Sequence, residues 1–337
     1  MKAIVRNPGL HALIVDEGRS GARALGIGPS GPMDIFAFMT GNFLAGNAVP
    51  APAIEFFLPA PEIYFEDSAL VAVTGPGLSV LVNEKIISAW KPFLIPPKST
   101  LKIITNGDSI CGYICVNNGW NAQEWLNSKT TSLAASMGGL NGRLLKKDDL
   151  LVSLQEQQLS AEDQQLFSDH MNWQISEKEI HEVYFQDKHI CCVRGPEAGK
   201  IGEPAEEAFV SGRFRISAKS NRMGYRLTGP PLINTNRLEM VSSAVDFGTI
   251  QLLPDGQLIV LMADHQTTGG YPRIATVIHA DLPGLVQFNR KKDISFTWCC
   301  ADTAYQIAEE RSRRLNEIKN SCLLQLNQYL PWKNQKR

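Results

Sequence analysis

The residues best suited to chemistry stand together in one stretch of the chain, residues 264–273. This stretch carries an acid, an imidazole, an amide, two hydroxyls, a phenol and a guanidinium. Its two glycines allow the backbone to come close to a bound molecule. Loops are also polar for solvation alone. Two interpretations therefore stay open: a binding site, or a loop at a barrel end that is held by its own hydrogen bonds.

Proton transfer is the first chemistry that this stretch could perform. We predict Asp264 as a base, with His265 or Tyr271 relaying protons, because positioned acids and bases of these types speed reactions that develop charge. Each role has a structural alternative. Asp264 could pair with Arg222, and Tyr271 could pack against Pro272.

Anion binding is the second chemistry. Arg222 or Arg273 could hold a carboxylate or a phosphate through two parallel hydrogen bonds. The backbone amides of Gly269 and Gly270 could face an oxyanion. We found neither a phosphate-binding loop of the G-x-x-x-x-G-K-[ST] type nor an acidic metal-binding motif in the sequence.

Short β-strands must position these groups. Residues 249–253 and 258–262 are apolar and β-branched, they flank the turn Pro254-Asp255-Gly256, and residues 274–278 form another such run. Similar runs, separated by turn residues, occur at 3–5, 13–15, 53–57, 62–65, 69–73, 79–82, 93–95, 100–104, 111–116, 189–197, 214–217, 220–227 and 294–298. This pattern predicts a mainly β protein built as barrels or sandwiches.

A glycine-rich stretch, residues 18–31, contains one match to the dinucleotide pattern G-x-G-x-x-G at 26–31. We reject a Rossmann site, because no strand precedes the motif and Pro29 lacks an amide that a pyrophosphate would use. Instead the stretch should lead into a helix, with Gly31 as its cap, Pro32 in its first position and Asp34 in its first turn. The amides of Ser30 and Gly31 would then suit an anion.

The composition excludes several classes of protein. With a net charge of -1, the chain has no global field that would attract nucleic acid or anionic lipid. There is no signal-peptide core, and no apolar run approaches the roughly 18 residues needed to cross a bilayer. The seven cysteines lack zinc-ligand spacing and are expected to be reduced. We therefore expect a cytoplasmic protein without nucleic-acid, membrane or metal sites.

The length of 337 residues predicts two domains. We expect an N-terminal β domain over residues 1–150, a polar linker over 151–188, a β-barrel domain over 189–300 and a C-terminal helix over 301–330. Asp302 or Thr303 could cap that helix. His170, His181 and His189 are predicted to be surface residues of the linker and its edge.

Several blocks of the sequence resemble one known family. They are residues 31–34, 46–47, 53–55 and 220–227, and the run from Gly248 through the 266–272 block to Pro283. On these blocks the chain resembles the allophanate hydrolase subunit 2 family, also called the biotin-dependent carboxyltransferase family, from about residue 3 to 298. The family usually has a Gly-Ser-Arg-Ser/Thr-Thr-like stretch where this chain has Asn127 to Thr131, and Trp120-Asn121 also departs from the family pattern.

The resemblance implies a fold and an activity. Members have cyclophilin-like β-barrel domains. The 5-oxoprolinase members form the C component of a complex that also has B and A components, and the complex opens 5-oxo-L-proline to glutamate with consumption of ATP. The resemblance thus implies ATP as cofactor, with its Mg²⁺ on a partner or at a shared interface. It also implies a small lactam or amide acid as substrate and inactivity of the chain alone.

A site for a lactam acid must hold its carboxylate, stabilise an oxyanion and move a proton. Beside the catalytic candidates above, we therefore assign substrate binding to residues of the matching blocks. They are Asn221, Arg222, Tyr225, Gln266, Thr267, Thr268, Gly269, Gly270 and Arg273, with Ser30 and Asp34 from the N-terminal half.

The resemblance leaves two other functions open. One is a biotin-dependent carboxyltransferase half of the urea type, which would need a biotin carrier that this sequence lacks. The other is a non-catalytic regulator of a kinase-inhibitor partner, for which Arg222, Asp264 and Arg273 would be dispensable.

Overall fold

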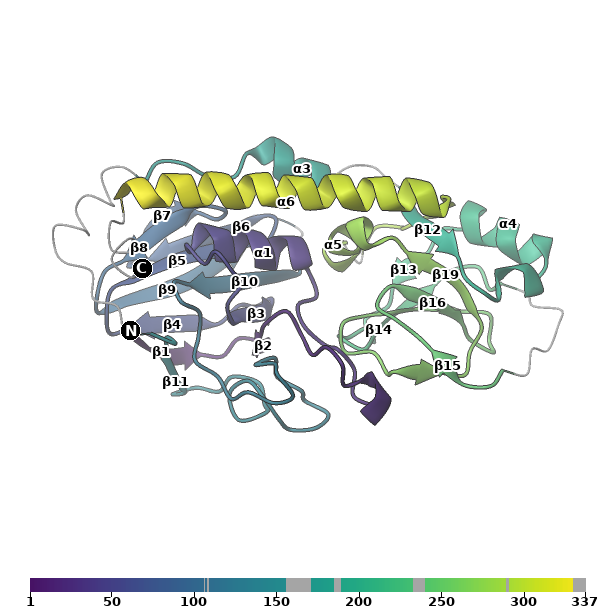
Figure 1. Cartoon of the computed structure of the whole chain (residues 1–337), viewed down its shortest axis with the longest axis horizontal. Helices are drawn as coiled ribbons and strands as arrows, with labels where there is room; N and C mark the ends of the chain where they lie inside the picture. Colours follow the sequence, from purple (N-terminus) through teal and green to yellow (C-terminus); the bar gives the residue numbers. More distant parts are fainter. Residues whose placement is uncertain are drawn as a thin grey trace. The chain divides into compact units, whose positions relative to one another are not determined.

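A computed structural model describes residues 1–105, 107, 109–155, 171–184, 189–232, 240–288 and 291–329. The chain forms two compact units, and each is described by itself. Unit 1 comprises Met1–Gly18, Asp34–His181 and Arg313–Arg337, and unit 2 comprises Arg19–Met33 and Glu182–Ser312. The mainly β class with a few helices, one of them C-terminal, is confirmed (Figure 1).

Unit 1 contains two antiparallel sheets. The first has the strand order β11-β1-β4-β9-β6-β7 and the second β2-β3-β10-β5-β8. Their strands are β1 (Lys2–Asn7), β2 (His11–Val15), β3 (Ala53–Phe57), β4 (Glu62–Phe65), β5 (Ala69–Thr74), β6 (Leu78–Val82), β7 (Lys85–Ser88), β8 (Pro92–Ile95), β9 (Ser99–Thr105), β10 (Cys111–Val116) and β11 (Leu150–Val152).

The core of unit 1 lies where helix α1 (Ile35–Leu44) packs on β5 and β10 (Figure 1). Every residue of these two strands is buried, which explains why their sequences are continuous apolar runs. A Cβ on Gly41 of α1 would lie 2.8 Å from both Cys115 Sγ and Thr74 Oγ1. The helix therefore needs a glycine at this position to approach the sheet so closely.

The start of α1 differs from the prediction. The helix begins at Ile35, and Asp34 is its N-cap, so Gly31 and Pro32 both precede it. Asp34 has an extended backbone, and its carboxylate accepts a hydrogen bond from the amide of Ala37 at 3.0 Å. In the first turn Asp34 would interact with the helix dipole alone, whereas at the cap it also satisfies an unpaired amide.

The polar stretch after β10 is held by partly buried carboxylates. Asp16 accepts hydrogen bonds at 2.6 Å from the hydroxyls of Ser128 and Thr130. Arg143 forms a two-point ion pair with Asp149, at 2.7 and 2.8 Å. The stretch at residues 127–131 is therefore fixed by internal contacts of unit 1.

Unit 2 is built on a seven-stranded sheet with the order β13-β14-β17-β16-β19-β12-β20. All of its pairs are antiparallel except β12 with β20. Its strands are β12 (Ile190–Arg194), β13 (Arg215–Ile216), β14 (Gly224–Thr228), β16 (Thr249–Leu252), β17 (Leu258–Leu261), β19 (Arg273–Val277) and β20 (Phe296–Trp298), and a small second sheet pairs β15 (Ser243–Ala244) with β18 (Thr268–Gly269).

Aromatic packing anchors one side of unit 2. Phe209, on helix α4 (Glu203–Ser211), stacks on Phe296 of β20 with ring centroids 4.9 Å apart. Phe214 lies 5.8 Å from Phe296, and the rings of all three residues are buried. A short helix, α5 (Leu282–Val286), adds buried apolar side chains to unit 2.

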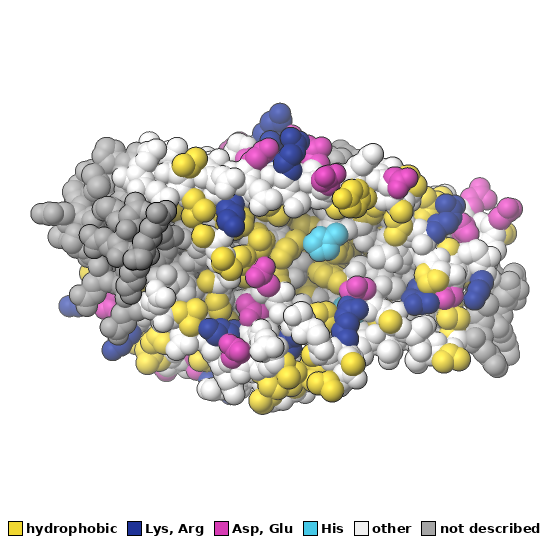
Figure 2. Space-filling view, viewed as in Figure 1, with side chains coloured by type: hydrophobic (Ala, Val, Ile, Leu, Met, Phe, Trp, Pro, Cys, Tyr) yellow, Lys and Arg dark blue, Asp and Glu magenta, His cyan; other side chains and the backbone are white. Residues whose placement is uncertain are grey.

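The remaining helices of the described residues are α3 (Glu177–Tyr184), α6 (Ala301–Tyr329) and the short 3-10 turns η1 (Arg23–Leu25), η2 (Ala198–Lys200) and η3 (His279–Asp281). Helix α6 begins at Ala301, so Asp302 lies in its first turn and not at its cap. None of the described helices has the length and apolarity that crossing a membrane requires. Acidic and basic side chains are interspersed on the face shown in Figure 2.

The predicted domain bounds stay predictions. The two units divide the chain differently, because residues 19–33 of the N-terminal half belong to unit 2. Within the predicted linker, residues 156–170, with His170, and 185–188 lie outside the described residues. Its described remainder includes α3, on which His181 is exposed, and His189 beyond it is exposed as well. The cyclophilin-like relationship also remains an expectation.

Candidate functional site

The glycine-rich stretch forms part of unit 2. We call residues 19–33 the strap, because they leave unit 1 after Gly18 and return to it at Asp34. The strap carbonyl of Gly31 accepts a hydrogen bond from Arg222 at 2.7 Å. A Cβ on Gly28 would lie 2.6 Å from the carbonyl oxygen of His265. The glycines thus serve a close approach between the strap and the loop at 264–273.

The expected anion seat at Ser30 and Gly31 does not form at a helix start, since α1 begins only at Ile35. The hydroxyl of Ser30 instead donates a hydrogen bond to the carboxylate of Asp264. The backbone of Ser30 has a positive φ of 57°, which holds the strap in a tight turn there. Ser30 is therefore part of a polar cluster that fastens the strap.

Arg222 and Asp264 form the centre of that cluster. Nε of Arg222 lies 2.7 Å from one oxygen of Asp264, and Nη2 lies 3.0 Å from the other. The Arg222 side chain is only 4% exposed. Burial disfavours ionisation of Asp264, but the charge and hydrogen bonds of Arg222 and the hydroxyl of Ser30 outweigh it and lower the pKa of the carboxyl. A carboxylate with a lowered pKa is a weak base.

The second candidate clamp, Arg273, also has a carboxylate partner. Its Nε and Nη2 each lie 2.9 Å from the carboxylate of Glu197, and Nη1 donates to the carbonyl of Ala244. These hydrogen bonds lower the pKa of Glu197. Both arginines predicted to hold a substrate anion are therefore occupied by acids of unit 2, and the clamp roles stay predictions that this geometry does not favour.

His265 is buried. Its Nδ1 lies 2.6 Å from the carbonyl of Gln266, so Nδ1 carries the proton and donates it. Its Nε2 is buried without a hydrogen-bond partner among the described residues and lies 3.8 Å from Asp246, which pairs with Arg23 of the strap. Burial lowers the pKa of His265. The second ring nitrogen lies near the Asp246 carboxylate without a hydrogen bond to it.

Two further candidates lie away from any open surface. Tyr225 is 1% exposed, and its hydroxyl donates to the carbonyl of Val286 at 3.3 Å, so its ring belongs to the core. Asp34 belongs to unit 1, where it caps α1, and its amide donates to Tyr113. The geometry therefore gives both residues structural contacts and supports neither as a substrate contact.

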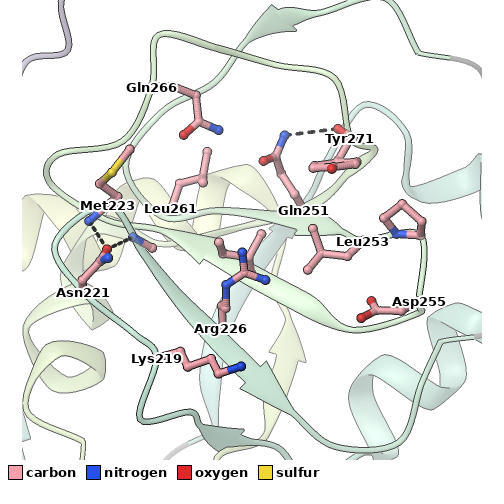
Figure 3. Close-up of a pocket in the computed structure, with 13 residues that line it drawn as sticks. Lys219, Asn221, Met223, Arg226, Gln251, Leu253, Asp255, Leu261, Gln266 and Tyr271 are labelled. Atoms are coloured by element: carbon pink, nitrogen blue, oxygen red, sulfur yellow. Dashed lines mark hydrogen bonds between the residues drawn. The ribbon is translucent and has the colours of Figure 1, made fainter. Parts of the chain in front are cut away.

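A pocket of about 540 Å³ opens on one face of the seven-stranded sheet (Figure 3). This volume lies in the range of small-ligand sites. Three predicted residues line it, namely Asn221, Gln266 and Tyr271. Four other polar residues of its lining were not predicted from the sequence: Lys219, Arg226, Gln251 and Asp255.

Strand alternation explains which residues reach the pocket. Residues two apart in a strand face the same side, so Gly224 and Arg226 of β14 share a face while Tyr225 and Leu227 point into the core. Arg226 stands opposite Ile259 of β17, and Ile259 stands opposite Gln251 of β16. One cross-strand row thus carries a guanidinium, an apolar side chain and a carboxamide into the pocket.

The pocket contains cations without acidic partners. Neither the ammonium of Lys219 nor the guanidinium of Arg226 makes a hydrogen bond or ion pair with any residue that the structure describes. Asp255 is the acid among the lining residues. Two cations and one carboxylate leave the lining with an excess of one positive charge. The pocket therefore suits a small anion.

Carboxamides and a phenol complete the pocket. Gln251 donates from Nε2 to the carbonyl of Tyr271 at 3.2 Å, which fixes the loop above it (Figure 3). Asn221 accepts from the amide of Met223 at 2.8 Å, and Gln266 is exposed at the rim. Carboxamides offer both donors and acceptors, so they could bind the N–H and the C=O of an amide.

The other loop candidates are engaged in backbone pairing. Thr268 and Gly269 form β18, and the carbonyl of Thr267 accepts from the amide of Val245. A Cβ on Gly269 would lie 2.5 Å from the Gln251 side chain. Gly270 lies beside this pairing and is exposed. These residues shape the loop that carries Gln266 and Tyr271.

Comparisons with known proteins agree with this architecture. A family model described as "Carboxyltransferase domain, subdomain A and B" matches residues 25–298. The chain is 34% identical over 309 residues to the C subunit of the 5-oxoprolinase of Haemophilus influenzae, covering 92% of this chain and 95% of that protein. It is 33% identical over 322 residues to the C subunit of the 5-oxoprolinase of Escherichia coli, covering 94% and 97%.

Solved structures show the same fold within larger proteins. The K. lactis urea amidolyase matches with a TM-score of 0.80 and 25% identity, over 94% of this chain and 20% of that chain. The solved structure of the protein TTHA0988 matches with a TM-score of 0.74 and 28% identity, over 88% of this chain and 56% of that chain. The chain therefore spans about half of TTHA0988 and a fifth of the urea amidolyase. The chain belongs to the carboxyltransferase-domain family that includes the C subunits of 5-oxoprolinases.

Proposed function

We propose that this chain is the C subunit of a multi-subunit, ATP-dependent 5-oxoprolinase, which opens 5-oxo-L-proline to L-glutamate in the cytoplasm. Its partners would be the A subunit and a cyclophilin-like B subunit of that enzyme. The supporting observation is the pocket of unit 2, where two cations that pair with no described side chain lie beside carboxamides. The similarity over more than nine-tenths of the chain to two proteins named as 5-oxoprolinase C subunits supports the same substrate class for that pocket.

The substrate makes three demands on a site. Its carboxylate needs a cation, its lactam N–H and C=O need hydrogen-bonding partners, and ring opening needs a proton donor. Lys219 and Arg226 answer the first demand, and Gln251 and Gln266 the second. Tyr271, which is 45% exposed at the pocket, carries a hydroxyl that could answer the third.

ATP would activate the lactam oxygen by phosphorylation. Among the residues that the structure describes, no group of three His, Cys, Asp or Glu side chains could hold a metal ion. The described residues thus provide no preformed cluster of metal ligands. We assign the Mg²⁺–ATP site to another polypeptide of the complex or to an interface with one, and we expect the chain to be inactive alone.

Reconstitution tests this proposal. The chain is purified alone and together with the A and B subunits, and glutamate formation from 5-oxo-L-proline is measured with and without ATP. We expect turnover only from the complex and only with ATP. Turnover by the isolated chain would contradict the shared site, and an assembled complex without turnover would contradict the proposed activity.

A carboxyltransferase half is the second candidate, because the matching family model and the urea amidolyase relatives favour it. Such an activity needs carboxybiotin on a carrier. Addition of avidin to the glutamate assay, and to a parallel assay of ATP- and bicarbonate-dependent carboxylation of urea, distinguishes the two functions, since avidin would block carboxyl transfer to urea and leave lactam opening unaffected.

A further inference from the structure

We propose that Lys219 and Arg226 are the specificity-determining residues of the pocket, and that they select the carboxylate of its substrate over neutral amides. This inference rests on the proposed function and adds to it the residues that recognise the negative charge of the substrate. It gives these two residues the task that the sequence predicts for Arg222 and Arg273.

The four cations differ in whether they are free to bind a substrate anion. Arg222 is buried against Asp264 and Gly31, and Arg273 is held by Glu197 and Ala244. Binding a substrate anion at either guanidinium would leave a carboxylate of unit 2 without its partner, which is costly in a buried site. Lys219 and Arg226 make no such contact with the described residues, so an incoming carboxylate displaces no described partner.

Arg226 and Lys219 reach the pocket from adjoining segments of the chain. Arg226 leaves the middle of β14, and the aliphatic part of its side chain starts beside Ile259 on the neighbouring strand. Lys219 approaches from the turn that precedes β14, so both cations line the same pocket (Figure 3). An apolar neighbour cannot neutralise a guanidinium, and it lowers the local dielectric, which strengthens an ion pair with a ligand.

The spacing between Arg226 and Gln251 suits a small lactam acid. Gln251 lies in the same cross-strand row as Arg226, one strand beyond Ile259. Adjacent strands are about 4.8 Å apart, so the two backbones lie roughly 10 Å apart and their side chains bridge part of that distance. A five-membered lactam with a carboxylate on its ring could present the acid to Arg226 and its N–H to Oε1 of Gln251, whose Nε2 is held by the Tyr271 carbonyl. Urea has an amide but no acid, so it would leave both cations without a partner.

Charge selectivity is measured with three probes on the full chain by titration calorimetry. They are 5-oxo-L-proline, the neutral lactam 2-pyrrolidinone, and urea. We expect 5-oxo-L-proline to bind at least about tenfold more tightly than either neutral probe, because one charged hydrogen-bonded contact has roughly that effect. That preference should shrink as salt is added. Equal binding of 5-oxo-L-proline and 2-pyrrolidinone would overturn the inference.

Variants assign the effect to residues. Lys219→Gln and Arg226→Gln should each weaken 5-oxo-L-proline binding about tenfold and leave 2-pyrrolidinone binding unchanged, with Arg226→Lys restoring part of the loss. Arg213→Gln and Lys292→Gln change exposed cations outside the pocket and should have no effect. Circular dichroism checks that all variants are folded.

The reconstituted complex separates this inference from the proposed function. If the wild-type complex turns over 5-oxo-L-proline and both pocket variants keep its KM, the inference is wrong and the proposed function stands. If the wild-type complex neither binds nor opens 5-oxo-L-proline, the proposed function is wrong, and the inference falls with it. A KM raised about tenfold in each pocket variant, with kcat nearly unchanged, supports both.

Discussion

Arg222 and Arg226 are four residues apart and have opposite roles in unit 2. Arg222 is buried and bound on two sides, by Asp264 and by the strap carbonyl of Gly31. Arg226 is exposed, with an apolar residue as its cross-strand neighbour. The difference shows that an arginine in a characteristic motif is not by that fact a ligand-binding group. What decides is whether the fold supplies a carboxylate within reach.

The loop at 264–273 divides in the same way. Asp264 and Arg273, at its two ends, pair with other side chains of unit 2. Gln266 and Tyr271, between them, line the pocket. We call Asp264, His265 and the strap residues that contact them the strap side, and the residues that line the pocket the pocket side. We therefore expect variants on the strap side to change stability and variants on the pocket side to change substrate affinity. Ranking variants by the free energy of unfolding tests that division.

Asp264→Ala should have the largest effect on stability. It leaves the buried guanidinium of Arg222 without a counter-charge, and loss of one partner of a buried pair costs about 3–5 kcal/mol. Urea denaturation measures the loss. Asp293→Ala is the matched control, because it breaks the exposed pair with Arg215 and should cost about 0–1 kcal/mol. Similar losses in both variants would mean that the Arg222–Asp264 pair does not hold the strap.

Gly28→Ala should have the second largest effect. The added Cβ would meet the carbonyl of His265 at 2.6 Å, so the strap must move, and such overpacking costs about 1–3 kcal/mol. Gly199→Ala is the control, because no atom lies within 4 Å of its Cβ, and it should stay within about 0.5 kcal/mol. An unchanged Gly28→Ala variant would show that the strap does not lie against His265.

Much of the fold could be predicted from local pattern. Runs such as 69–73 and 111–116 are apolar and β-branched and became β5 and β10, which are buried throughout. Strand β7 (Lys85–Ser88) was missed, because it is short and largely exposed and follows a turn at Asn83-Glu84. Exposed strands form through pairing with a neighbour, here β6, and their own composition carries little signal.

The site could be predicted less completely, because its decisive contacts join distant residues. The pair of Arg273 with Glu197 spans 76 positions, and no local pattern indicates it. Arg226 and Gln251 meet through the register of three strands, which alternation within one strand does not reveal. One signal in the sequence could have indicated Arg226. Tyr225 and Leu227 are apolar and predict the buried face of this strand, so Arg226 must lie on its opposite face together with Gly224.

The strap side should also respond to acid. Burial lowers the pKa of His265, so the unfolded chain binds a proton at its ordinary pKa of 6.5 while the folded chain resists it. Stability should therefore fall as the pH drops below about 6.5, by at most about 1.4 kcal/mol per pH unit for this group. The pKa of His279 is lowered as well, so it adds to the slope.

Urea denaturation of His265→Gln between pH 7 and pH 5 isolates this contribution. The free energy of unfolding of His265→Gln should depend less steeply on pH than that of the wild type. The His279→Gln variant should retain the part of the pH dependence that His265 contributes. The pKa of Asp264 is lowered from 3.8, so its own contribution is lost only at more acidic pH, outside this window. A slope that is the same in His265→Gln and in the wild type would place the titration on other groups.

Tyr271→Phe should change stability least, by less than about 0.5 kcal/mol. The loop is held through the backbone carbonyl of Tyr271, which accepts from Gln251, and the phenol contributes nothing to that contact. If the hydroxyl relays a proton, kcat of the reconstituted complex should fall at least about a hundredfold with little change in KM. Because Phe keeps the ring at the pocket, unchanged kcat would remove Tyr271 from the chemistry. A large loss of stability would instead assign the phenol to the fold, and the contrast between the two sides of unit 2 would fail at this residue.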